Sequence, residues 1–214
     1  MSKFKTVLAA LCVIAIAAPV THAATIGAEV FGAFNTHNMQ DVNDALAVDN
    51  GLGASFDELS NGMTGGLGMR IWPNATWMIE ACWEPLFLES KSSTTNSTWN
   101  MDANSLQVSA YRFFPSANPN ARFGVGGGVG IYSVAGENVD PSQTPATLKI
   151  EGSGPGLHLM GVGEWTMSPS FNLTGGAGLR FANIEIDRST NNSTADYSGF
   201  MARVGLAFYF PQSK

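Results

Sequence analysis

Charged side chains recur inside the most apolar stretches of this sequence, and they carry its clearest chemistry. Only 13% of the residues are charged, so charges at these places need partners. Carboxylates and guanidinium groups enclosed together form paired, charge-assisted hydrogen bonds. We therefore expect a buried charge network made of Glu29, Arg70, Glu80, Glu84, Glu164, Arg180 and Arg203. Arg122 lies beside an expected turn and is a further candidate.

Few other residues suggest catalysis or metal binding. His158 shares a polar series with Glu164, and Ser109 and Ser153 are the serines expected near it in space. A hydrolase would need such a histidine beside a serine and an acid, and this is the least favoured hypothesis. Cys82 has no local histidine or cysteine partner. We therefore expect no catalytic residue, no metal site and no cofactor.

The charged residues lie in segments where apolar and polar residues alternate, the pattern of a strand with two different faces. One face of each segment is apolar, and the other carries the charges and many glycines, with Phe31 as an exception. The eight segments are 26–35, 63–71, 77–87, 105–110, 123–131, 157–165, 172–181 and 200–210. The glycine face of the fifth segment leaves room for neighbouring arginines or for a thin file of water.

The connections between these segments alternate in length. Residues 37–60, 91–102, 137–148 and 189–196 form long connections, whereas 72–76, 115–121 and 167–170 form short ones. Short turns at one end and long loops at the other are typical of up-and-down outer-membrane barrels, and lipid forbids an open sheet edge. The sequence predicts an all-β fold, an eight-stranded antiparallel up-and-down transmembrane β-barrel with both termini in the periplasm.

The first long connection contains a predicted helix. Met39, Val42 and Leu46 lie at helical spacing within residues 38–50. Asn38 is the expected N-cap and Gly51 the expected stop. The helix covers the mouth of the barrel in one interpretation and contacts a ligand or another surface in the other.

Aromatic residues gather near both ends of the expected strands, as in the interfacial bands of membrane barrels. The band near the short turns comprises Trp72, Trp77, Phe113, Phe114, Phe171, Phe208, Tyr209 and Phe210. The band near the long loops comprises Phe31, Phe34, Phe87, Tyr132 and Phe181. A soluble lipocalin-type barrel is the alternative, but its interior would be apolar and its exterior polar.

Composition and the N-terminus narrow the class further. The 214-residue chain has a formal net charge of −6, which argues against a nucleic-acid-binding protein. Lys3 and Lys5 precede an apolar stretch at 7–20 and a small residue, Ala23, the layout of a secretory signal peptide. We expect a signal peptide at 1–23 and one barrel domain at 24–214.

The signal peptide, the eight alternating segments and a final segment reading FMARVGLAFYF resemble the small outer-membrane barrels of the OmpA-transmembrane-domain and OmpX kind. The resemblance covers the whole mature chain as architecture. It implies an outer-membrane location, outer-membrane lipid and lipopolysaccharide as neighbours, and recognition of the last strand, which ends at Phe210, by the barrel-assembly machinery.

Together these observations predict a non-enzymatic envelope protein with a structural or surface role and a lumen largely closed by charges. The first alternative is a narrow channel or small-molecule transporter that uses the same charges. The second is a lipid-modifying enzyme centred on His158. The polar loops present a surface whose partner the sequence does not identify.

Overall fold

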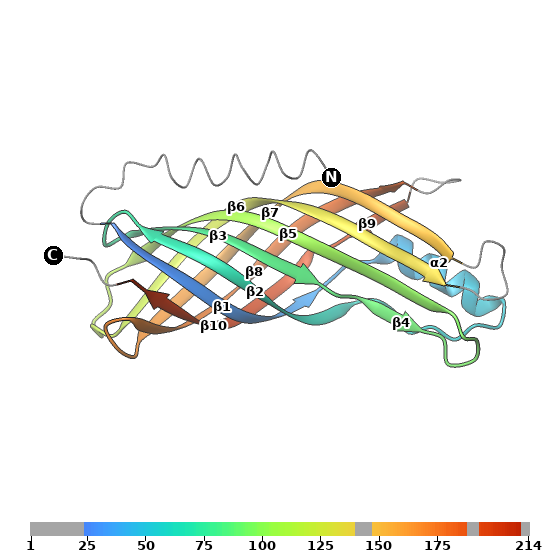
Figure 1. Cartoon of the computed structure of the whole chain (residues 1–214), viewed down its shortest axis with the longest axis horizontal. Coiled ribbons are helices and arrows are strands. Elements are labelled where there is room, and N and C mark those ends of the chain that lie inside the picture. The colour runs from blue at the N-terminus through green and yellow to red at the C-terminus, as the bar shows by residue number, and fades with distance from the viewer. Residues whose placement is uncertain (1–23, 140–146, 188–192, 211–214) are drawn as a thin grey trace.

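The computed structural model describes residues 24–139, 147–187 and 193–210, which form one antiparallel β-barrel with a short helix (Figure 1). The elements are β1 (Thr25–Thr36), α2 (Gln40–Gly51), β2 (Asn61–Trp72), β3 (Trp77–Leu86), β4 (Glu89–Lys91), β5 (Thr98–Phe114), β6 (Ala121–Val139), β7 (Thr147–Thr166), β8 (Phe171–Asp187), β9 (Ser193–Asp196) and β10 (Gly199–Tyr209). The expected signal peptide lies outside the described residues. Within the described part of the chain, no helix is long and apolar enough to cross a membrane.

The sheet closes on itself. β1 pairs with β2 on one side and with β10 on the other, and β10 also pairs with β8. β3 and β4 are successive parts of one barrel strand, because both pair with β5. β9 and β10 are likewise successive parts of one barrel strand, which pairs with β8. The described elements thus make eight antiparallel barrel strands, which confirms the predicted fold class.

The two ends of the barrel differ, and we name them the turn end and the loop end. The turn end carries the short connections 73–76, 115–120 and 167–170, together with the start of β1 and the end of β10 (Figure 1). The loop end carries α2, β4 and β9. The predicted alternation of short and long connections holds clearly only for residues 37–60, because β4 and β5 are separated by 92–97 alone, a connection as long as 115–120 at the turn end.

Several strands run further toward the loop end than the sequence suggested. β5 begins at Thr98, inside a stretch expected to be a loop, and β9 occupies the second half of another, 189–196. Asn100 and Asp102 alternate with buried Met101 and Ala103 on this part of β5. Because the outward residues here are polar rather than apolar, the stretch has the composition of a loop although its backbone is a strand.

α2 closes the wall of the loop end. The strands from β5 to β8 are longer than β1, β2 and β3, which leaves one side of the loop end open. α2 lies there against β9, where the Thr194 amide donates to Asp41 Oδ2 at 3.2 Å. Residues 52–60 connect α2 to β2 and pass beside β4, where Ser90 Oγ donates to the Asp57 carbonyl at 2.8 Å. The helix therefore completes the barrel wall at this end.

The helix begins one residue later than predicted. Met39, not Asn38, is the N-cap, and no side chain caps the helix there. The Asn38 side-chain amide instead donates to Asp196 Oδ2 at 3.1 Å, and its backbone amide donates to the Ser198 carbonyl at 3.0 Å. Asn38 therefore ties the chain to the end of β9 rather than capping the helix. Val42 and Leu46 face inward into an apolar core shared with strand residues. That core includes Leu86, Leu88, Trp99, Met101, Val134, Ile184, Ile186 and Tyr197.

Alternation along the strands separates the lumen from the outer surface as predicted, and it corrects five aromatic positions. Phe31, Trp72, Phe113, Tyr132 and Tyr209 are buried in the lumen rather than placed in the interfacial bands. Trp72 shows the physical reason, because its indole Nε1 donates to the Tyr209 hydroxyl at 3.0 Å. Trp77, Phe114, Phe171 and Phe210 remain exposed at the turn end.

Large neighbouring side chains fill the space beside the inward glycines. A Cβ atom on Gly126 would lie 2.1 Å from the Ala110 carbonyl oxygen and 2.8 Å from the Tyr111 ring. One on Gly66 would lie 2.3 Å from the Phe31 ring. The glycine series of β6 therefore accommodates side chains of β5, where the sequence suggested room for neighbouring arginines or a thin file of water.

Candidate functional site: the charged lumen

Arg70 is the centre of the larger charge cluster in the lumen. Strand β2 presents it inward, and its side chain is only 3% exposed. Its Nη2, Nε and Nη1 atoms lie 2.6, 2.9 and 2.7 Å from carboxylate oxygens of three acids, Glu29, Glu80 and Glu164. One planar guanidinium on β2 thus joins three other strands, and its most distant partner, Glu164, lies 94 residues from Arg70 in the sequence. It uses the fork geometry that favours arginine over lysine.

Arg203 and Arg122 balance the remaining charge of this cluster. Arg203 approaches Glu80 with Nη1 and Nη2 at 2.7 and 3.0 Å. Arg122 binds Glu164 Oε2 with Nε at 2.9 Å and Nη2 at 2.7 Å, and its Cζ lies 3.7 Å from the centre of the Trp72 ring. Three arginines therefore face three carboxylates. We name these six residues, with Arg70 at the centre, the Arg70 cluster.

Neutral side chains complete the Arg70 cluster. Glu164 also accepts hydrogen bonds from the Tyr209 hydroxyl at 2.7 Å and from the Asn172 amide at 3.2 Å. Thr174 Oγ1 donates to Glu29 Oε1. The sequence analysis did not assign these three residues to the network. Strand alternation nevertheless places them on the inward face of β8 and β10, which is the signal that could have identified them.

Arg180 and Glu84 form a second, looser group nearer the loop end. Arg180 Nη1 lies 3.6 Å from Glu84 Oε2, beyond normal hydrogen-bond length. Neutral amides support the acid, because Asn35 Nδ2 and Gln107 Nε2 donate to it at 2.9 and 3.2 Å. Arg180 Nε donates to the Tyr197 carbonyl at 3.0 Å. We name Arg180, Glu84, Asn35 and Gln107 the Arg180 group.

His37 borders the Arg180 group just beyond β1. Its Nδ1 lies 3.4 Å from Arg180 Nη2, and its ring meets the Tyr197 ring edge-on at 5.4 Å. Burial, and then the nearby Arg180 charge, lower the pKa of His37 from its ordinary value of 6.5 to about 4. The imidazole is therefore neutral at pH 7 and accepts at Nδ1.

A serine and a histidine meet between the two charged groups. Ser109 Oγ lies 2.8 Å from His158 Nε2, and both side chains are buried. His158 Nδ1 has no hydrogen-bond partner among the described residues, so no acid orients this pair as a nucleophile–base–acid triad requires. Ser153, the other serine considered, is exposed, and Cys82 is buried in the lumen.

The outer surface of the barrel is apolar over its middle. Val30, Val129 and Val204 are more than half exposed, and the neighbouring outward positions are mostly leucine, phenylalanine and tryptophan. Outward acids, such as Asp102, appear only toward the loop end among the described strand residues. A polar lumen inside an apolar surface is the reverse of a soluble barrel.

Comparison with solved structures identifies the fold. Neisserial surface protein A is 11% identical, with a TM-score of 0.58 over 88% of this chain and 99% of its own. A major outer-membrane protein of Thermus thermophilus gives 12% and 0.57, over 88% of this chain and 100% of its own. OprG of Pseudomonas aeruginosa gives 12% and 0.54, over 87% and 95%. The chain has the fold of the small outer-membrane β-barrels.

No protein-family model matches the chain, and no curated protein sequence matches it significantly. Because the barrel has eight strands, its interior is only just wide enough for side chains to fill. The Arg70 cluster, the Arg180 group and the ring-filled glycines occupy that interior. All seven charged residues singled out in the sequence face the lumen, although they form two groups rather than one network.

Proposed function

We propose that this protein is an outer-membrane β-barrel with a structural or surface role, whose lumen is closed by ion pairs. The observation that carries the proposal is Arg70, which is held by three carboxylates at 2.6–2.9 Å across the lumen. Opening a path there requires separating buried charges. Leaving one charge of such a buried pair without its partner costs about 3–5 kcal/mol. The apolar core under α2 adds a second seal at the loop end.

The apolar outer surface supports placement in a lipid bilayer. A continuous exposed apolar face is unstable in water but matches the outward face of membrane barrels. With the turn end on the periplasmic side, as short turns are in such barrels, both described chain ends face the periplasm. The long loops then face outward with a partner yet to be identified. Lipid and lipopolysaccharide surround the barrel, and the assembly machinery engages β10.

We propose no catalytic role for His158. Among the described residues, its hydrogen-bond partner is Ser109, and both side chains lie inside the lumen between the two charged groups. A hydrolase would need an acid on Nδ1 and a route for substrate to the serine. If expression of the protein changes the mass of lipid A and His158→Ala abolishes the change, this part of the proposal is wrong.

Single-channel recording tests closure directly. The mature chain is refolded, its heat-dependent gel mobility is checked, and it is inserted into planar bilayers. We expect no discrete openings. Reproducible small openings that change when Glu84→Gln or Arg180→Gln is introduced would contradict the proposal and favour a narrow channel. A variant at an exposed ion pair, Lys91→Gln, is the matched control.

A further inference from the structure

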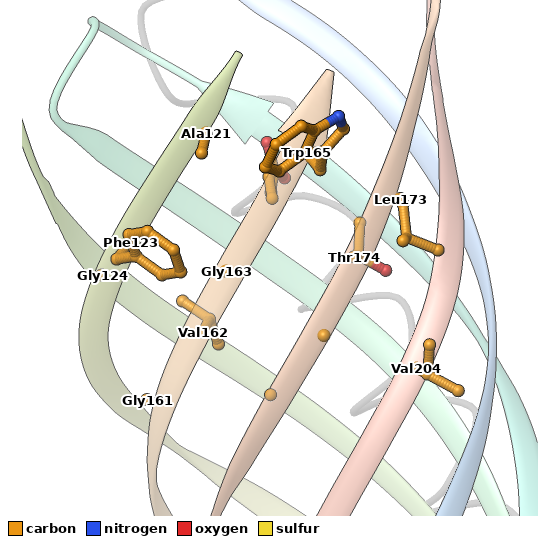
Figure 2. Close-up of a pocket in the computed structure, with 13 residues that line it drawn as sticks. Ala121, Phe123, Gly124, Gly161, Val162, Gly163, Trp165, Leu173, Thr174 and Val204 are labelled. Atoms are coloured by element: carbon orange, nitrogen blue, oxygen red, sulfur yellow. The ribbon is translucent and has the colours of Figure 1, made fainter. Parts of the chain in front are cut away.

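The outer surface of the barrel contains a long apolar groove near the turn end. One part, of about 610 Å³, is bounded by Phe123, Trp165, Leu173 and Val204 (Figure 2). A second part, of about 630 Å³, is lined by Val125, Leu159 and Leu179 among other residues. The two parts meet at Gly161 and follow β7 between its neighbours. The groove is therefore one elongated, lipid-facing depression.

Two outward glycines of this groove, Gly161 and Gly175, are not required by the packing of the barrel, whereas a Cβ atom on outward Gly127 would lie 2.4 Å from the His158 carbonyl oxygen. A Cβ atom on Gly161 would lie 3.9 Å from its nearest neighbour, the Ala177 carbonyl oxygen, and one on Gly175 would lie 3.8 Å from the Arg203 carbonyl oxygen. Both are ordinary contacts, unlike the 2.1 Å approach at inward Gly126. At Gly161 and Gly175 the depth of the groove is therefore a property of the outer surface itself.

An exposed cation lies beside this groove. Arg112 occupies an outward position of β5, two residues before its turn-end limit, where it pairs in register with Trp77 and Val125. None of the ion pairs among the described residues includes Arg112. An arginine on the lipid face is costly away from the interface, so its charge calls for an anion at the headgroup level. Val125, its neighbour, lines the groove.

We propose that Arg112 and this groove bind one glycerophospholipid, with the phosphate on the guanidinium and an acyl chain along the glycine floor. The inference rests on the membrane placement proposed above. An elongated apolar groove fits a hydrocarbon chain, and guanidinium binds phosphate through two parallel hydrogen bonds. A second copy of the chain fits less well, because the turn-end half of the described outer surface carries no carboxylate to meet Arg112.

Native mass spectrometry of the refolded mature chain in detergent tests the site, with palmitoyl-oleoyl-phosphatidylglycerol as the probe. We expect one bound lipid, about tenfold weaker binding for Arg112→Gln, and recovery of most of the affinity by Arg112→Lys. A diacylglycerol with the same chains, which lacks the phosphate, should also bind about tenfold more weakly. Tenfold corresponds to the loss of one charge-assisted hydrogen bond.

The acyl-chain part of the site has its own variant and control. Gly161→Val fills the groove and should weaken binding about tenfold. Gly32→Val is the control, because Gly32 is also outward, its nearest Cβ contact is likewise 3.9 Å, and it lies on β1 outside the groove. Both positions accept a β-branched residue that strands favour.

Three results would overturn the inference. They are unchanged binding to Arg112→Gln, equal losses for Gly161→Val and Gly32→Val, or a dimer that Gly161→Val abolishes, which would make the groove a contact between copies. Heat-dependent mobility and conductance of the same samples separate this inference from the proposed function. A folded, closed barrel that ignores the lipid refutes only the lipid site, whereas an open barrel refutes closure.

Discussion

Arg70 and Arg180 are both buried arginines in one lumen, but they are held in different ways. Arg70 contacts three carboxylates at 2.6–2.9 Å, whereas Arg180 faces one carboxylate at 3.6 Å. In the Arg180 group the other partners are neutral, because Arg180 donates to the Tyr197 carbonyl and Glu84 accepts from the Asn35 and Gln107 amides. The turn-end half of the lumen is therefore closed by charge.

The loop-end half is closed by apolar packing instead. Leu46 of α2 and Ile184 of β8 are among the fully buried residues of its core. Such a core resists opening through buried area and close packing rather than through ion pairs. One lumen thus uses two kinds of seal, and the looser Arg180 group lies where they meet.

The largest expected effect is the loss of Arg70. Arg70→Gln leaves three carboxylates around two arginines, and breaking a buried network in this way costs about 3–5 kcal/mol. Urea unfolding of the refolded barrel, followed by tryptophan fluorescence, measures the change. Lys91→Gln removes an exposed pair and should change the free energy of unfolding by less than about 1 kcal/mol. Equal stability of the two variants would remove the distinction between the halves of the lumen.

The apolar seal gives the next largest effect. Leu46 is 2% exposed in the loop-end core, and Leu46→Ala should lower the free energy of opening α2 by about 2–4 kcal/mol. Hydrogen exchange of the α2 amides should accelerate while β6 and β7 stay protected. Val48→Ala, at a position 65% exposed on the same helix, is the control and should leave exchange nearly unchanged. Faster exchange throughout the barrel would show that α2 is part of one cooperative unit with the strands.

A smaller effect is expected at Arg180. Arg180→Gln should cost about 1–3 kcal/mol, since Glu84 keeps its hydrogen bonds from Asn35 and Gln107. In a double-mutant cycle with Glu84→Gln, the two changes should cost less together than the sum of the single changes. Urea unfolding measures all three variants. A loss as large as that for Arg70→Gln would mean that the 3.6 Å pair is as strong as the tighter cluster.

Strand alternation explains how much of this lumen could be predicted from the sequence. It placed Glu29, Arg70 and Glu80 on one side of their strands, and the short turn after Trp72 brings Arg70 opposite Glu80. The contact between Arg70 and Glu164 spans 94 residues. It depends on closure of the barrel and on the register of several strands, which no local pattern specifies.

The errors came from giving residue type more weight than position. Trp72, Phe113 and Tyr209 lie at inward parity, but as aromatic residues they were assigned to the interfacial bands. Arg112 was missed although it shares the outward parity of Ala110 in the same strand. The first five residues of β5 were likewise expected to be a loop, because their outward side chains are polar. Composition at the loop end follows exposure to water rather than backbone conformation.

The smallest expected effect is a pH dependence confined to the loop end. The folded protein holds His37 neutral, with a pKa of about 4 against an ordinary value of 6.5. Above pH 6.5 the residue is neutral in both open and closed states and contributes no pH dependence. As the pH falls below 6.5, the open state binds a proton first, so the closed loop end loses stability until the pH nears 4.

Hydrogen exchange of α2 between pH 7 and 5, corrected for the intrinsic pH dependence of exchange, measures this loss above the ordinary pKa values of carboxyl groups. We expect α2 to open more readily as the pH falls in the native protein and to show a flatter profile in His37→Gln. The difference between the two profiles isolates the contribution of His37. Identical profiles would show that protonation of His37 does not disturb the contact with Arg180, and that the junction of the two seals is more tolerant of charge than its geometry indicates.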